Sequence, residues 1–172
     1  MSEREFDVVI FGASGYTGKL VAEYMHKEYE GNDSIKWAIA GRNKEKLSSV
    51  KDDLGLNKNI SIIEVDSTNE DSLDSMTCSA KCILTTVGPY QIYGSNLVKS
   101  CANNGTDYVD LTGEPGWMYE MINAHKKTAE NSGARIVFSC GFDSIPFDLG
   151  VYFIQQEVLK KYGKAAQHVR GR

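Results

Sequence analysis

The sequence predicts an α/β protein, built on a doubly wound parallel sheet with helices on both faces. Two observations lead to this prediction. Short apolar runs rich in β-branched residues alternate along the chain with longer amphipathic segments, which is the pattern of a parallel sheet covered by helices. A glycine-rich turn, residues 12–18, follows the first apolar run and opens the first amphipathic segment.

Each apolar run is expected to be a strand and each amphipathic segment a helix. The expected strands are residues 6–11, 35–40, 60–65, 82–87, 107–111 and 135–140. The expected helices are residues 16–30, 43–54, 70–76, 93–104, 117–131 and 146–161. Six strands joined by right-handed crossovers suit the order 3-2-1-4-5-6 of a Rossmann-type sheet, with the ligand crevice where strands 1 and 4 diverge.

The helix ends carry recognisable signals. Asn104 and Gly105 favour a C-cap after the fourth helix. Asp143 and Ser144 precede the last helix, and capping it is the role we favour for both. We expect residues 1–161 to form the dinucleotide-binding domain, and residues 162–172 to begin the linker to a second domain.

Composition narrows the classes of partner. The net charge of −4 gives no general attraction to nucleic acid or to an anionic membrane. No apolar run has the length of a membrane span and residues 1–5 do not begin a signal peptide, so we expect a cytoplasmic protein. The four cysteines lack metal-site spacing and no histidine lies near them in the sequence, so we expect reduced thiols and no bound metal.

The glycine turn predicts a dinucleotide site. Gly12 permits a tight turn, Gly15 lets the backbone approach a pyrophosphate, and Gly18 lets the helix pack closely on the sheet. The free N–H groups at the helix start would face the phosphates, assisted by the positive end of the helix dipole. The expected cofactor contacts of this turn are Gly12, Ala13, Ser14, Gly15, Tyr16, Thr17 and Gly18.

The end of the second strand predicts NADP(H) in preference to NAD(H). An NAD site places an acidic residue there, whereas this chain has Arg42, followed by Lys44 and Lys46. A guanidinium can hold a 2′-phosphate through paired, charge-assisted hydrogen bonds. The alternative is a solvated helix start, although positive charge is slightly unfavourable at that end of a helix dipole.

Polar and glycine residues also follow the later strands. Asp66, after the third strand, either contacts the adenine or caps the next helix. The loop after the fourth strand holds Val87, Gly88, Pro89 and Tyr90, which we expect near the nicotinamide ribose. Glu114, after the fifth strand, is interpreted as a helix-start carboxylate rather than a catalytic acid.

Five motifs occur here in an order that resembles the N-terminal cofactor domain of saccharopine dehydrogenase-like oxidoreductases, a group that includes trans-acting enoyl reductases. They are residues 11–18, 40–42, 87–90, 110–114 and 141–146, and the resemblance covers nearly the whole chain. It implies a nicotinamide-dependent reductase whose second domain binds a small-molecule substrate and often forms a homodimer. It assigns the cofactor to the glycine turn and Arg42, with Gly88, Pro89 and Tyr90 on the nicotinamide side.

Two other functions were weighed against this reductase. A short-chain dehydrogenase needs a tyrosine followed four positions later by a lysine, and none of the nine tyrosines meets that requirement. A non-catalytic NADP(H)-binding sensor or interaction module would keep the same cofactor residues, so it stays open as the alternative.

Overall fold

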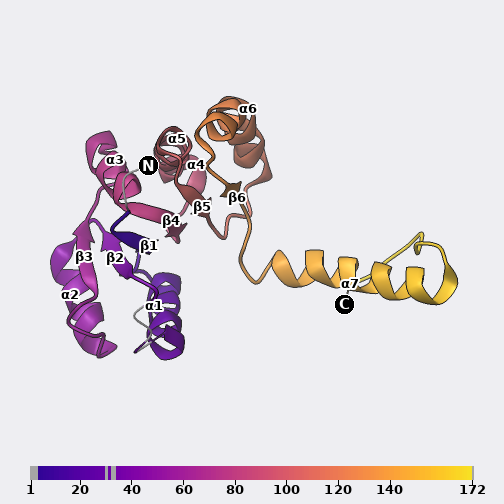
Figure 1. The fold of residues 1–172 in the computed structure, drawn as a ribbon, viewed down its shortest axis with the longest axis horizontal. Helices are drawn as coiled ribbons and strands as arrows, with labels where there is room; N and C mark the ends of the chain where they lie inside the picture. Colours follow the sequence, from indigo (N-terminus) through magenta and orange to yellow (C-terminus); the bar gives the residue numbers. More distant parts are fainter. Residues whose placement is uncertain (1–3, 30, 32–33, 172) are drawn as a thin grey trace.

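The computed structural model describes residues 4–29, 31 and 34–171. Six parallel strands form one sheet in the order β3-β2-β1-β4-β5-β6, which confirms the predicted fold class and strand order (Figure 1). Three positions named in the sequence predictions lie outside the described residues: residue 1 of the expected dinucleotide-binding domain, residue 172 of the expected linker, and Glu30, the expected last residue of the first helix. The strands are β1 (Phe6–Phe11), β2 (Trp37–Gly41), β3 (Ser61–Glu64), β4 (Ala80–Thr85), β5 (Asp107–Val109) and β6 (Ile136–Val137).

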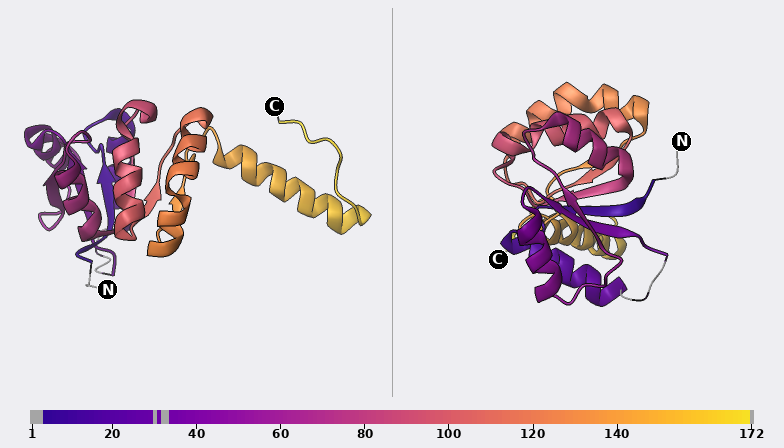
Figure 2. Two further views of the ribbon diagram at one scale, coloured as in Figure 1. Left: turned by 90° about the horizontal axis from the view of Figure 1, so that it is seen from above. Right: turned by 90° about the vertical axis from the view of Figure 1, so that its left-hand side faces the viewer.

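Helices cover the two faces of this sheet. In Figure 2, right, α1 and α2 lie on one side of the strands, and α3, α5 and α6 lie on the other. The helices are α1 (Tyr16–Tyr29), α2 (Lys44–Asp53), α3 (Glu70–Ser79), α4 (Tyr90–Tyr93), α5 (Ser95–Asn104), α6 (Pro115–Ser132) and α7 (Ile145–Tyr162).

Each face of the sheet has its own apolar core, because side chains alternate along a strand. Val9 and Phe11 of β1 pack with residues of α3, α5 and α6. Ile10, between them in sequence, belongs to the cluster formed with α1 and α2. All three side chains are buried, so β1 is the central layer that joins the two cores.

The expected helix 93–104 is divided into α4 and α5 at Gly94. A Cβ at this position would lie 2.6 Å from a ring carbon of Trp117 and 2.8 Å from the Tyr90 carbonyl oxygen. The missing side chain therefore makes room for the Trp117 indole, whose N–H donates to Ser95. The C-cap at Gly105 is confirmed, since Gly105 is left-handed and its N–H donates to Cys101 O.

Strands β5 and β6 are shorter than expected, because the Asp110 side chain takes hydrogen bonds from amides that would otherwise continue the pairing of the two strands. The Asp110 carboxylate accepts hydrogen bonds from the amides of Thr112 and Ser139, and from the Tyr108 hydroxyl. Ser139 takes a left-handed backbone conformation with φ of 59°. Residues 110–113 and 138–141 therefore form loops fixed to each other at the carboxyl edge of the sheet.

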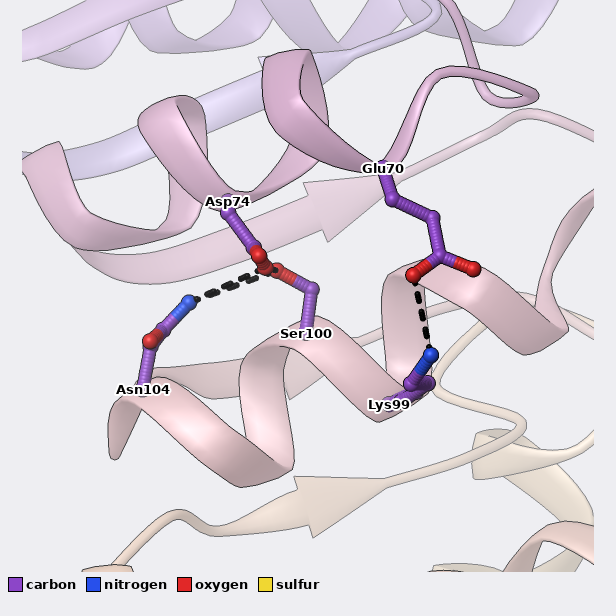
Figure 3. Close-up of polar contacts among 5 residues, drawn as sticks. All are labelled: Glu70, Asp74, Lys99, Ser100 and Asn104. Atoms are coloured by element: carbon purple, nitrogen blue, oxygen red, sulfur yellow. Dashed lines mark hydrogen bonds and ion pairs between the residues drawn. The ribbon is translucent and has the colours of Figure 1, made fainter.

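A polar seam joins α3 to α5 on the outer side of the larger core. Figure 3 shows Asp74 accepting from Ser100 and Asn104, and the ammonium group of Lys99 lies 2.9 Å from Glu70. The exposed ion pair contributes little to the free energy of unfolding. The hydrogen bonds instead tie α5 to α3, the helix that leads directly into β4.

Helix α7 extends away from the sheet in Figure 1 and in Figure 2, left. The helix forms as expected, but none of its side chains is buried. Large apolar side chains project into solvent along its length, among them Phe147, Tyr152 and Phe153. The residues after it turn back along it, and the Gln155 side chain exchanges two hydrogen bonds with the backbone of Ala166.

Candidate cofactor site

A pocket of about 290 Å³ lies at the carboxyl ends of β1, β2 and β4, where the sheet order reverses. In open α/β sheets this crevice is the usual ligand site, because helix N-termini face it. A larger hollow of about 650 Å³ opens at the opposite edge, beside the first residues of β1 and β2 and the last residues of α1. The pocket at the carboxyl edge is lined by Phe11, Gly12, Ser14, Gly15, Gly41, Arg42, Val65, Ser67, Thr86, Val87, Gly88 and Tyr93.

Two glycines of the turn allow the close packing of the backbone around the base of this pocket. Gly12 has a φ of 93°, and a Cβ there would lie 2.7 Å from Thr86 Oγ1 and 2.8 Å from Val87 Cγ2. A Cβ on Gly18 would lie 2.2 Å from the Gly12 carbonyl oxygen and 2.7 Å from Ala13 Cα. The first glycine lets the turn meet the β4 loop, and the last lets α1 pack against the turn.

The middle of the turn is open toward the pocket. Gly15 is exposed, and the only close neighbour of a Cβ there would be the Gly12 carbonyl oxygen, at 3.3 Å. The first amides of α1, which have no intrahelical acceptor, follow directly. A backbone cradle of this kind at a helix start fits a pyrophosphate, so the residues present suit a dinucleotide.

Arg42 lies at the rim of the pocket, after the last residue of β2. Its side chain is exposed and, in the chain as described, makes no hydrogen bond. The helix that follows is capped by Asn43, which accepts from the Lys46 amide at 2.7 Å. Arg42 is therefore not needed for the helix start, and it lines the pocket.

Asp66 does not cap the next helix, so that alternative is wrong. Its carboxylate accepts from the amide and hydroxyl of Thr68, and these bonds lower the pKa of Asp66, with a smaller effect from the positive charge of Arg42. Asn69 caps α3 instead, accepting from the Ser72 amide. Asp66 is thus a carboxylate at the end of β3, one residue from the pocket-lining Ser67, and an adenine contact stays a prediction.

The structure brings together only part of the predicted cofactor set. Gly12, Ser14, Gly15, Arg42, Val87 and Gly88 line the pocket. The remaining predicted residues lie around it: Ala13 is buried in the core, Gly18 packs against the turn, Tyr16 is 85% exposed, and Thr17, Asp66, Pro89 and Tyr90 are outside the lining.

Tyr90 is turned into the core beside Trp117. The two ring centroids are 5.6 Å apart, and the Tyr90 hydroxyl donates to Thr85 O and accepts from the Leu111 amide. Burial raises the pKa of Tyr90 to about 12, so the phenol is neutral at physiological pH. Its position makes it an anchor for the loop between β4 and α4.

Two capping expectations at the later loops are corrected by the structure. Ser144 occupies the N-cap position of α7, but no side chain caps that helix. Glu114 precedes α6, yet its carboxylate accepts from the amides of Tyr90 and Gln91 at 2.8 Å each. It therefore caps α4, more than 20 residues earlier in the chain.

Several pocket residues were not predicted from the sequence. Thr86 directly follows β4 and Ser67 comes three residues after β3, and this position beyond a strand end was the available signal for both. Tyr93 reaches the pocket only because α4 ends there, and the sequence instead predicted that Tyr93 begins a long helix.

Comparison with known sequences identifies the family of the chain. Residues 8–137 match the family described as saccharopine dehydrogenase NADP binding domain. A trans-acting enoyl reductase of Mycobacterium leprae is 43% identical over 159 residues, covering 92% of this chain and 37% of that protein. One from Mycobacterium tuberculosis is 47% identical over 152 residues, covering 88% and 36%. The chain thus spans little more than a third of the length of these relatives.

Solved structures show the same fold. Saccharopine dehydrogenase (L-Glu forming) from Saccharomyces cerevisiae, in its apo form, aligns with a TM-score of 0.69 at 20% identity, covering 90% of this chain and 32% of that one. Triphenylmethane reductase of Citrobacter sp., complexed with NADP(H), aligns with a TM-score of 0.58 at 17% identity, covering 88% and 55%.

No helix within the described ranges is both long and apolar enough to cross a membrane. The family match covers β1 to β6, and so includes the glycine turn, Arg42 and the whole pocket lining. The chain belongs to the saccharopine dehydrogenase NADP-binding domain family, and its cofactor is NADP.

Proposed function

We propose that this chain is the NADP(H)-binding domain of an oxidoreductase that reduces enoyl substrates. The observation that carries the proposal is the pocket itself. An open backbone cradle at the start of α1 lies beside a guanidinium that makes no hydrogen bond within the described chain. These two features match the two charged parts of NADP(H), its pyrophosphate and its 2′-phosphate.

NADPH, when bound, supplies the hydride for reduction. The residues of this chain bind and orient it. The amides at the start of α1, near Gly15, would hold the pyrophosphate, with hydroxyl support from Ser14. Arg42 would hold the 2′-phosphate, and Val87 and Gly88 would border the ribose on the nicotinamide side. Asp66, at the end of β3, would lie toward the adenine.

The enoyl substrate is supported by the relatives, two of which are named trans-acting enoyl reductases at 43% and 47% identity. Both are about two and a half times the length of this chain, so we place substrate contacts outside the cofactor pocket described here. The chain alone is then expected to bind NADPH without oxidising it.

Arg42 provides the test of the cofactor assignment. Losing the equivalent of one charge-assisted hydrogen bond of about 1.5–3 kcal/mol predicts that Arg42→Ala weakens NADPH binding roughly tenfold to a hundredfold. NADH binding should change by less than about twofold, because NADH lacks the phosphate. Lys46→Ala is the matched control: it also removes one exposed positive charge next to β2, but Lys46 does not line the pocket. Calorimetric titration of each variant with NADPH and NADH measures both affinities.

If Arg42→Ala weakened NADPH and NADH binding equally, the proposal that Arg42 binds the 2′-phosphate would be wrong. For the reaction, a longer protein carrying this domain is mixed with NADPH and an enoyl thioester, and loss of the reduced nicotinamide absorbance is followed. Turnover by the 172-residue chain itself would contradict the placement of substrate contacts outside it.

A further inference from the structure

The loop on the nicotinamide side of the pocket is held from outside the pocket by one carboxylate. Glu114 Oε1 accepts from the Tyr90 amide and Oε2 from the Gln91 amide, both at 2.8 Å. These are the first two amides of α4, a four-residue helix. Each carboxylate oxygen therefore accepts one bond from α4, and these two amides are not available to a ligand phosphate.

Pocket-lining residues lie on both sides of this attachment. Thr86, Val87 and Gly88 come directly before α4, and Tyr93 is its last residue. Only Pro89 separates the pocket-lining Gly88 from the amide of Tyr90. A shift of the start of α4 would therefore move the whole wall that faces the glycine turn.

Glu114 is itself held in place by the loop after β5. Its own amide donates to Thr112 Oγ1, and the Thr112 amide donates to the buried Asp110 carboxylate. Asp110 also binds the Ser139 amide and the Tyr108 hydroxyl, which links this loop to the ends of β5 and β6. Glu114 is half-buried, so it is partly shielded from water.

We infer that Glu114 is a positioning residue for NADP(H), one that sets the β4–α4 loop against the nicotinamide half of the cofactor and leaves the adenosine half unaffected. This inference rests on the proposed function and adds to it a residue that touches neither the pocket nor the ligand. The difference between the nicotinamide half and the adenosine half follows from the layout of the pocket. Arg42, Val65 and Ser67 stand at the ends of β2 and β3, on the opposite side of β1 from the β4–α4 loop.

The test compares two ligands that differ only in the nicotinamide half. Adenosine 2′,5′-bisphosphate carries the adenosine with its 2′- and 5′-phosphates, whereas NADPH also carries the second phosphate of the pyrophosphate, the nicotinamide ribose and the nicotinamide. The full chain and its Glu114→Ala and Glu114→Gln variants are titrated with both ligands by calorimetry. Glu120→Ala removes an exposed carboxylate from α6, the helix that Glu114 precedes, and is the matched control.

We expect Glu114→Ala to weaken NADPH binding by about tenfold and adenosine 2′,5′-bisphosphate binding by less than about twofold. Glu114→Gln keeps one acceptor oxygen and should fall between Glu114→Ala and the unaltered chain for NADPH. Glu120→Ala should match the unaltered chain with both ligands. Hydrogen exchange gives a readout independent of the ligand, because the Tyr90 and Gln91 amides should exchange faster in Glu114→Ala.

A purely structural role would weaken the two ligands equally, and that result would overturn the inference. Unchanged NADPH affinity in both Glu114 variants would overturn it as well. If Glu114→Ala does not fold, the Glu114→Gln titrations decide by the same comparison. Failure of the unaltered chain to bind either ligand would instead refute the proposed function, and with it the inference.

Discussion

The three glycines of the turn have different tasks, and alanine substitutions can separate them. In Gly18→Ala the new Cβ would lie 2.2 Å from a carbonyl oxygen and 2.7 Å from a Cα, both on the backbone. Neither atom can rotate away, so α1 must move by about 1 Å, and the cost belongs near the upper end of the 1–3 kcal/mol typical of overpacking. A loss of about 3 kcal/mol corresponds to a Tm lower by roughly 6–12 °C for a chain of this size.

Gly15→Ala should behave in the opposite way. Its Cβ would meet only the Gly12 carbonyl oxygen, at 3.3 Å, so the free energy of unfolding should change by less than about 1 kcal/mol. The same methyl group would stand where the pyrophosphate approaches the backbone, so NADPH binding should fall at least about tenfold.

Urea denaturation and calorimetric titration of NADPH measure the two quantities on the same samples. Gly116→Ala serves as the control, because among the described residues no atom beyond its own stretch of α6 lies within 4 Å of a Cβ at that position. The reasoning would be refuted if Gly18→Ala were as stable as the control. It would equally be refuted if Gly15→Ala kept its NADPH affinity, since the cradle would then not contact the cofactor.

Two further predictions concern the groups that fix the carboxyl edge. Tyr90→Phe removes the hydroxyl that donates to Thr85 O and accepts from the Leu111 amide. Urea denaturation should show a free energy of unfolding lower by about 1 kcal/mol. An unchanged free energy of unfolding would show that these two bonds contribute nothing. Asp110→Asn tests the pH dependence of the free energy of unfolding. Burial raises the pKa of Asp110 above the ordinary aspartate value of 3.8. The stabilisation linked to its protonation is therefore complete below that ordinary value and is lost as pH rises through the folded-state pKa. The destabilisation caused by Asp110→Asn should therefore shrink as pH rises from about 4 to 7, and a cost that grows over that range would contradict the direction of the shift.

Much of the fold could be predicted because its signals are local. The β-branched composition of β1 and the spacing of glycines in the turn each act within a few residues, and right-handed crossovers then fix the strand order. Arg42 could be found in the same way, since it directly follows β2. Its position at the pocket rim required no knowledge of distant parts of the chain.

The errors concern partners that lie far away in the sequence. Glu114 was expected to serve the helix it precedes, but the free amides nearest to its carboxylate belong to α4. Tyr90 was expected on the nicotinamide side of the cofactor, and that contact stays a prediction; its ring packs beside Trp117 and its hydroxyl accepts from the Leu111 amide. Gly94 divides a helical pattern because a tryptophan from α6 fills the space beside it. Spacing along the chain carries no information about such contacts.

Helix α7 has a consequence for how the chain loses its structure. Because it buries none of its side chains, it gains no stability from either core of the sheet. An 18-residue helix of this kind is marginal in water by itself, so its amides should exchange with solvent long before those of β1. Heating should then unfold the chain in two stages, first the projecting helix and later the cofactor domain. The exposed aromatic side chains of the helix would also make its stability depend on protein concentration, while that of the cofactor pocket would not.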